Sequence, residues 1–421
     1  MTFRLSANHW RPQDRLSHTQ TVRTYREVFA LPEFRVLFLV RCVTMAAISI
    51  ASLALGATTY ASTGSPVLTA LSMFGGPLIT LLGSATVLSA SDSMGPRRAS
   101  TIMPIAYAVA FLLQALPHLS WGWRFAILAI PFLAGSATSG STMRLLHDIV
   151  PPDGFVLGRA TLNIAVGVMQ VAGYGLGGLL LVWFSSTTLF LAAAIAAAAA
   201  ALFLRLGIRE RPGVVSRQGL VTRTREVNRA LIGSPVTRPL YLAMWVPNGL
   251  VVGCEALFVP YAGQSGAGYL FATTAAGMLL GDVVVGRFVP PRHRDRMIEP
   301  LRMLLALPYL GFLFSPSLAV ALVLGFVASA GYSASLPLQE RLVGAIGPEM
   351  RGQAFGLYST GLMVGQAIGA AVGGLLATGL GAPHAMGTLA VASLCITVAL
   401  VPGLRRSAPA TNSAAITGHP S

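Results

Sequence analysis

The chain has 421 residues, of which 54% are hydrophobic and only 10% are charged, and its formal net charge is +15. Because a soluble domain carries about 25% charged residues, this composition excludes most soluble enzyme folds and indicates a polytopic membrane protein. All 29 basic residues are arginines that lie between apolar runs rather than on one basic face, which favours membrane topology over nucleic-acid binding.

Twelve apolar runs reach the length of about 20 residues that a membrane-spanning helix needs. The segment before the first run, residues 1–35, is polar and basic, and we expect it to be an uncleaved cytoplasmic tail. We therefore predict an all-α integral membrane protein with twelve transmembrane helices. In chain order, the predicted spans are residues 36–61, 66–90, 99–116, 122–143, 159–183, 187–206, 239–262, 267–289, 298–315, 317–337, 352–379 and 384–404.

The placement of arginines predicts the orientation of these spans. Every second loop is rich in arginine, whereas intervening loops such as residues 62–65 contain none. Arg124 is the exception on the opposite side, and Arg41 lies just inside the first span, where snorkelling to the interface would explain it. The positive-inside rule then places both termini, the central loop 207–238 and the C-terminal tail 405–421 in the cytoplasm of a multi-pass plasma-membrane protein.

The chain also contains an internal repeat. Residues 168–180 read VMQVAGYGLGGLL and residues 364–376 read VGQAIGAAVGGLL, at a constant offset of 196 residues. The aligned glutamines and glycines predict two pseudo-symmetric six-helix halves, residues 36–206 and 239–404, related by a parallel repeat. Upstream at the same offset, Pro152 aligns with Pro348 and Asp153 with Glu349.

Two motifs within this arrangement resemble those of the major facilitator superfamily. Residues 92–98 read DSMGPRR, which resembles the family's D-R-x-G-R-R turn with departures at Ser93 and Pro96. Residues 173–178 read GYGLGG, which resembles the G-P-x-x-G-G motif of the family's exporters with Tyr174 in place of proline. The exporters' arginine in helix 4 is absent, because the matching stretch begins with Pro131.

The resemblance implies that helices 2, 5, 8 and 11 pack the two halves against each other. Small residues let membrane helices approach closely, so the duplicated glycines are candidate sliding surfaces, and ordinary packing is the alternative. Residues 173–178 also spell G-x-G-x-x-G, but they lie inside an apolar run with no acid after them until Glu210, which argues against nucleotide binding. The candidate interface residues are Gly173, Gly177, Gly178, Gly369, Gly373 and Gly374.

The turn at residues 92–98 has a second implied role. In the resembled family its aspartate lies at a cytoplasmic gate, paired with an arginine or a helix end. We therefore expect a gate made of Asp92, Gly95, Arg97 and Arg98, with a solvated loop acid as the alternative for Asp92.

Two carboxyl residues lie within predicted spans. Glu255 lies about 24 Å from the cytoplasmic face and Asp282 about 10 Å from it, at the α-helical rise of 1.5 Å per residue. An ionised carboxylate at membrane depth costs several kcal/mol, so such residues face a partner or water. Because helix 7 lines the central cavity in the resembled family, Glu255 is the first candidate for proton coupling or substrate binding and Asp282 the second. A structural carboxyl is the alternative for each.

The remaining polar residues inside the spans are uncharged. Gln170, Gln366, Asn163 and Asn248 are candidates for a polar cavity, and the duplicated glutamines are expected near the pseudo-axis. No catalytic constellation, metal-ligand spacing or cofactor motif is evident, so we expect neither an enzyme nor a metal or cofactor site.

These features predict a secondary active transporter that moves a small organic molecule by alternating access, with proton-coupled efflux as the preferred mode. The alternatives are a nutrient uptake facilitator or symporter, and a receptor or scaffold that does not transport. We expect its partners to be the small-molecule substrate, protons and the lipid bilayer, with no nucleic acid, and we expect a monomer.

Overall fold

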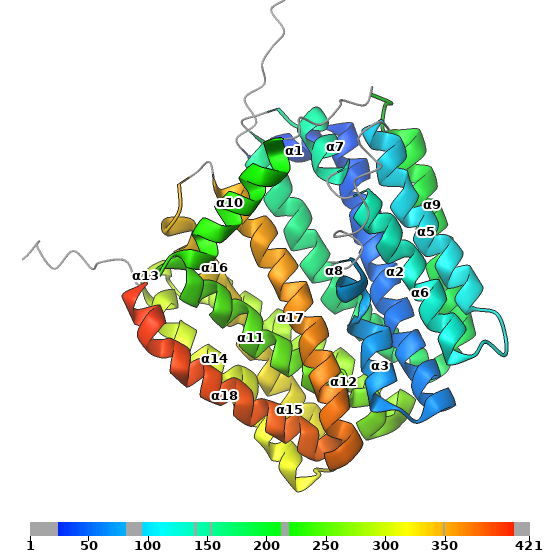
Figure 1. Ribbon diagram of the computed structural model, residues 1–421, viewed down its shortest axis with the longest axis vertical. Helices are drawn as coiled ribbons and strands as arrows, with labels where there is room; N and C mark the ends of the chain where they lie inside the picture. The colour runs from blue at the N-terminus through cyan, green and yellow to red at the C-terminus, as the bar shows by residue number, and fades with distance from the viewer. Residues whose placement is uncertain are drawn as a thin grey trace, which may run out of the picture.

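The computed structural model describes residues 24–80, 95–138, 141–151, 154–211, 219–347 and 350–407, and every regular element in these ranges is a helix (Figure 1). Of the predicted residues, Asp92 and the repeated acids Asp153 and Glu349 lie outside the described part of the chain.

The N-terminal half contains the helices up to Gly207, and one further helix lies in the predicted central loop. Proline occupies the first turn of α2, α3 and α5, where its missing N–H costs no hydrogen bond. The helices are α1 (Tyr25–Ala30), α2 (Pro32–Thr63), α3 (Pro66–Phe74), α5 (Pro96–Gln114), α6 (Trp121–Ala137), α7 (Ser141–Ile149), α8 (Phe155–Trp183), α9 (Ser186–Gly207) and α10 (Gly219–Gly233).

The C-terminal half contains more interrupted helices. They are α11 (Thr237–Glu255), α12 (Phe258–Val283), the π-helix η3 (Val284–Phe288), α13 (Pro291–Arg294), the 3₁₀ turn η4 (Asp295–Met297), α14 (Ile298–Ala306), the 3₁₀ helix η5 (Leu307–Phe314), α15 (Leu318–Ala330), the 3₁₀ turn η6 (Gly331–Ala334), α16 (Ser335–Gly344), α17 (Arg351–Leu380) and α18 (Ala382–Arg406).

Each of the twelve predicted spans coincides with helix in the described residues. Eight of the described helical segments are long and apolar enough to cross a membrane. One of the other four contains α3 and the helical residues 76–80, and its remainder, residues 81–90, lies outside the described part of the chain. The remaining three contain α5, α6 and α11, which are shorter or carry more polar residues. The all-α class and the twelve-helix arrangement are therefore confirmed.

Particular residues explain the breaks between and within spans. Gly263 has φ 68°, so the first turn of α12 is separated from the rest, and the predicted boundary between spans seven and eight falls at this glycine. Pro308 cannot donate an α-helical hydrogen bond, and the ninth span continues there as the 3₁₀ helix η5. A π-helix follows Asp282, a feature that is frequent at functional sites.

The packing of helices repeats between the halves. In the N-terminal half α2 packs against α8 and α9, and in the C-terminal half α11 packs against α17 and α18. These are the first, fifth and sixth spans of each half, as the sequence repeat predicts. The halves meet where α8 packs against α12 and α3 against α17 (Figure 1).

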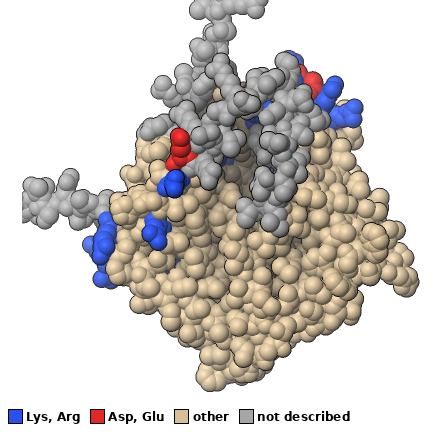
Figure 2. Space-filling view, in the orientation of Figure 1, with Lys and Arg blue, Asp and Glu red and all other residues tan. Residues whose placement is uncertain are grey.

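Charged side chains gather at one end of the bundle. On the face shown in Figure 2, the atoms of arginines and acids lie along the upper and left edges, and the lower part of the described surface shows none. We call the arginine-rich ends of the spans the inner ends and the opposite ends the outer ends. A belt without exposed charge is what a surface in contact with lipid requires.

Candidate functional site

Glu255 is the last residue of α11, and it accepts a hydrogen bond from a tyrosine of another span. The hydroxyl of Tyr332, in η6, lies 3.0 Å from Oε1 of Glu255. The Tyr309 ring is fully buried, and its hydroxyl, which is within electrostatic range of Glu255, has no hydrogen-bond partner among the described residues. A hydroxyl donor stabilises an ionised carboxylate, so Tyr332 offsets part of the cost of placing Glu255 at membrane depth.

An aromatic cluster that includes a tyrosine of the other half lies near this carboxylate. Tyr174 of α8 lies within electrostatic range of Glu255 and stacks on Phe271 of α12, with ring centroids 5.5 Å apart. Phe74 of α3 lies 5.7 Å from the Tyr174 ring, and Phe258 lies 5.0 Å from Phe271. Glu255 is therefore placed beside an aromatic cluster that crosses from one half to the other.

Asp282 lies in a second polar cluster of the C-terminal half. Its Oδ1 is buried without a hydrogen-bond partner among the described residues. Tyr358 of α17 is within electrostatic range of both Asp282 and Arg302 of α14, and Arg302 is also within range of Tyr332. Arg302 is only 3% exposed, and no ion pair or hydrogen bond of its guanidinium is formed with any described residue. The cluster thus contains one unpaired cation and one unpaired acid.

Tyr309, Tyr332 and Arg302 were not predicted from the sequence, and Tyr174 was noted only as a departure from the exporter motif. The tyrosines come from α8, η5 and η6, and no spacing in the sequence relates them to Glu255. The position of Arg302 in the predicted ninth span was a usable signal, because a charged side chain inside the membrane is costly and usually has a functional or structural role.

The six candidate interface glycines do not all lie between the halves. Gly178 faces the backbone of Gly268 in α12, and a β-carbon at Gly374 would lie 2.7 Å from Cα of Val67 in α3. These two contacts join the halves at the outer ends of the spans. Gly175, outside the predicted set, also faces the other half, with a β-carbon position 3.0 Å from Cβ of Ala275.

The other four candidate glycines pack within their own half, which corrects the prediction. A β-carbon at Gly173 would lie 2.7 Å from Cβ of Ser49 in α2, and one at Gly177 would lie 3.1 Å from Cα of Ile50. Gly369 and Gly373 face Gly249 and Gly253 of α11 in the same way. Adjacent helical residues point about 100° apart, so positions 177 and 178 serve different neighbours.

The described members of the candidate gate contact the end of α9. Nε of Arg97 lies 2.7 Å from Oε2 of Glu210, and Nη1 lies 3.0 Å from the carbonyl of Arg205 and 3.1 Å from that of Ile208. Arg98 lies 3.6 Å from the same Glu210 carboxylate, and Gly95 packs directly against it. Arg97 therefore caps the C-terminus of α9, where carbonyl groups lack helical partners.

Arg341 has the equivalent role in the C-terminal half. Its Nη1 donates to the carbonyl of Leu404 at the end of α18, at 2.8 Å, and its guanidinium pairs with Asp295. Arg294 joins Glu340 at 2.6 Å and the carbonyl of Gly286 at 2.7 Å. The inner ends of both halves are thus held by arginines on helix ends.

Two of the four polar-cavity candidates form a pair. Nε2 of Gln366 donates to Oδ1 of Asn248 at 3.2 Å, between α17 and α11. No hydrogen bond joins Gln366 to Gln170, although both residues are described, so the duplicated glutamines do not pair across the pseudo-axis. Gln170 and Asn163 lie half-buried on α8.

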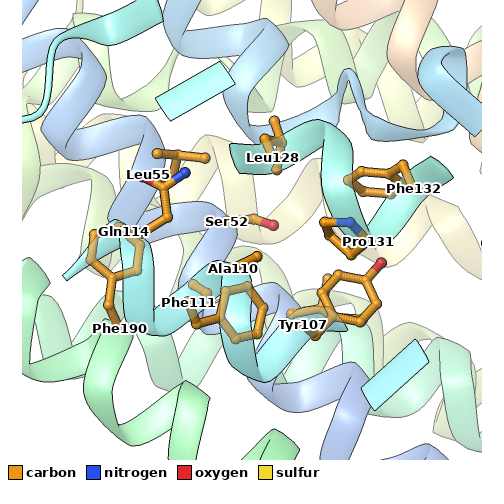
Figure 3. A pocket seen from close by; sticks show the side chains of 12 residues that line it. Ser52, Leu55, Tyr107, Ala110, Phe111, Gln114, Leu128, Pro131, Phe132 and Phe190 are labelled. Carbon is orange, nitrogen blue, oxygen red and sulfur yellow. The ribbon is translucent and has the colours of Figure 1, made fainter. Parts of the chain in front are cut away.

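A small cavity lies inside the N-terminal half, between α2, α5, α6 and α9 (Figure 3). Its volume is about 20 Å³, and its lining includes Ser52, Tyr107 and Gln114 among apolar residues. The outer end of α5 beside it is tied to α6, since Nε2 of Gln114 donates to the Arg124 carbonyl at 2.8 Å. A volume of this size accommodates about one water molecule and is too small for an organic substrate.

Comparison with known proteins agrees with this arrangement. The sequence model of the Major Facilitator Superfamily matches residues 261–419, which lie in the C-terminal part of the chain. No curated protein sequence matches the chain. A POT family transporter solved with 5-aminolevulinic acid superposes with a TM-score of 0.64 at 12% identity, over 89% of this chain and 96% of that one.

The resemblance to the major facilitator superfamily is confirmed. A bacterial homologue of the human lysosomal transporter Spinster, in an inward-facing unoccupied conformation, superposes with a TM-score of 0.63 at 14% identity, over 89% of this chain and 96% of that one. A peptide transporter of the POT type in complex with sulfate gives 0.64 at 12% identity, over 91% of this chain and 99% of that one. The fold of these transporters therefore extends over both halves.

Proposed function

We propose that the chain is a secondary active transporter that moves a small organic molecule by alternating access, with Glu255 as the site of proton coupling. The observation that carries this proposal is the position of Glu255, which is hydrogen-bonded to Tyr332 and within electrostatic range of Tyr174 of the other half. A carboxyl at the junction of two halves that move relative to each other changes its surroundings during the cycle, and this change is what couples proton binding to movement. Asp282 is the second candidate.

Small molecules bound by proteins of the same fold support the choice of substrate class. The similar structures include a transporter bound to 5-aminolevulinic acid and one bound to a thioalcohol-conjugated peptide, both small polar organic molecules. For this chain, we propose a small organic substrate without specifying it further. We also propose a monomer in the plasma membrane with both termini in the cytoplasm.

Efflux is the preferred direction, since residues 173–178 resemble the exporter motif. Tyr174 and Pro131 depart from the exporter pattern, so uptake by a facilitator or symporter is the alternative, and a receptor or scaffold without transport is the third possibility.

Flux of a panel of labelled compounds tests these possibilities. The panel is followed in cells with and without the protein, before and after the proton gradient is collapsed. Net efflux that stops when the gradient is collapsed is the expected result. Gradient-driven uptake would establish a symporter, gradient-independent equilibration a facilitator, and an absence of flux for every compound would support the scaffold.

A further inference from the structure

A groove of about 550 Å³ lies at the inner end of the seventh span, between α10 and α11. Its lining combines two arginines with aliphatic and aromatic residues. The lining residues are Arg229, Ile232, Gly233, Arg238, Tyr241, Leu242 and Trp245.

The walls of this groove are fixed by contacts outside it. Leu231 of α10 is 4% exposed and belongs to the core that contains Leu240 and Met244 of α11. Asn228 accepts a hydrogen bond from Nε2 of Gln353 in α17 at 2.8 Å. These contacts hold α10 against the C-terminal half, so the groove is a preformed site rather than a gap beside a loose segment.

The aromatic side of the groove is equally constrained. The Tyr241 hydroxyl donates to the carbonyl of Ala354 at 3.2 Å, and Nε1 of Trp245 donates to the carbonyl of Tyr358 at 3.0 Å. The two rings pack with centroids 5.0 Å apart. Because their polar atoms already have partners within the protein, both rings present apolar surface to the groove.

The charge of the groove is positive. Arg229 and Arg238 are exposed, and neither forms an ion pair with a described residue. Glu226 lies one turn before Arg229 on α10, is also exposed, and is not within ion-pair distance of it. In Figure 2, arginine atoms are visible in the region of α10 and the beginning of α11, with one group of acidic atoms above them and an uncharged surface below.

We propose that this groove binds an anionic phospholipid from the leaflet on the arginine-rich side of the membrane. The headgroup phosphate lies against Arg229 and Arg238, and the first part of an acyl chain lies along Ile232, Leu242 and Trp245. From residue 238 to residue 245 the helix rises about 10 Å, which matches the depth of the boundary between headgroups and acyl chains. A small soluble anion would contact the two arginines but would make no contact with the apolar walls of the groove.

Native mass spectrometry of the purified full-length protein tests the proposal, with phosphatidylglycerol and phosphatidylcholine of matched chains offered together. The unaltered protein is expected to retain phosphatidylglycerol preferentially. Arg229→Gln/Arg238→Gln should weaken that binding by about 25-fold, since each arginine near the headgroups contributes about fivefold. The control, Arg296→Gln/Arg406→Gln, removes the same charge from two exposed arginines elsewhere at the inner ends and should change the affinity less than twofold.

A second pair of measurements separates a lipid from a free anion. Ile232 is 43% exposed, so Ile232→Gln should fold normally while weakening phosphatidylglycerol binding through loss of the acyl-chain contact. Equal phosphatidylglycerol affinity in the unaltered protein and the double variant, with matching melting temperatures, would overturn the proposal. Competition by inorganic phosphate at similar affinity, insensitive to Ile232→Gln, would also overturn it, because the groove would then be a site for soluble anions.

Discussion

Glu255 combines the two properties that a coupling residue needs, which are a titratable group and a surrounding that depends on both halves. Its hydrogen bond to Tyr332 lies within the C-terminal half, and its proximity to Tyr174 depends on the position of the N-terminal half. A relative movement of the halves therefore alters the electrostatic environment of the carboxyl while leaving one hydrogen bond in place.

The variant Glu255→Gln tests whether transport needs a titratable group at this position. The amide keeps the size of the side chain and can accept the Tyr332 hydrogen bond, but it cannot bind a proton near neutral pH. We expect gradient-driven transport to be abolished while passive exchange of substrate between the two sides continues, measured as counterflow in proteoliposomes. Full gradient-driven transport in this variant would place the proton site elsewhere and make Asp282 the leading candidate. Loss of exchange as well would identify Glu255 as a substrate ligand.

The unpaired charge of Arg302 predicts a gain in stability when it is removed. A charge buried without its counter-charge is strongly destabilising, and the Arg302 guanidinium has no ion pair with a described residue. Arg302→Met should therefore raise the free energy of unfolding of the purified protein by about 1–4 kcal/mol, measured by chemical denaturation. Asp282→Asn, which also removes an unpaired carboxylate, should not lower it, and the double variant should match the sum of the two effects to within about 0.5 kcal/mol. A loss of stability in Arg302→Met would show that the guanidinium stabilises the fold through a partner.

At the scale of the helices, residues 177 and 178 show what a membrane sequence encodes and what it does not. The apolar runs predict the spans because length and hydrophobicity are properties of one segment. The glycine repeat predicts close packing, because only small residues permit it. Which of two adjacent glycines faces the partner half depends on the rotation of α8 about its axis, and the neighbouring helices determine that rotation.

Part of the candidate site could also be predicted from the sequence. A carboxylate inside an apolar run stands out because its burial is costly, so Glu255 and Asp282 were found from the sequence. Tyr332 is 77 positions away along the chain from Glu255, and tyrosine is common in apolar spans. Its role follows only from the bend of the tenth span at η6, which no local pattern specifies.

Gly178→Val tests the contact between the halves. An added side chain would meet the backbone of Gly268, which cannot move aside as a flexible side chain can. Overpacking of this kind costs about 1–3 kcal/mol, which lowers the population of the state closed at the outer ends by about 5–150-fold. We expect the variant to reach the membrane and to transport at least about fivefold more slowly, measured with the substrate found in the flux panel.

Gly122→Val is the matched control for this variant. It lies at the beginning of α6, where an added β-carbon would meet nothing within 4 Å, and it should transport at the unaltered rate. If Gly178→Val also transports at that rate, the contact between α8 and α12 at the outer ends is not a step in the cycle.

At the scale of the whole molecule, the separation of charge along the bundle agrees with the repeat of the fold. Arginines cap the ends of α9 and α18, which are the last spans of the two halves. Both helices end on the same side of the bundle only if the C-terminal half has an even number of spans, and a half of six satisfies this condition. The inner ends therefore carry the arginines for two reasons, capping of helices and retention of positive charge on one side.

Single cysteines on opposite sides test the orientation that this asymmetry predicts. Gly122 and Gly344 are both exposed and have open space for a side chain, and they lie at the outer and inner ends of the spans. In a background with Cys42, Cys254 and Cys395 replaced by alanine, Gly122→Cys should react with a membrane-impermeant maleimide in intact cells. Gly344→Cys should react only after the cells are permeabilised, because the arginine-rich ends are predicted to face the cytoplasm. The reverse labelling pattern would show that the arginine-rich ends face the outside of the cell. The direction of transport in the proposed cycle would then be uptake instead of efflux.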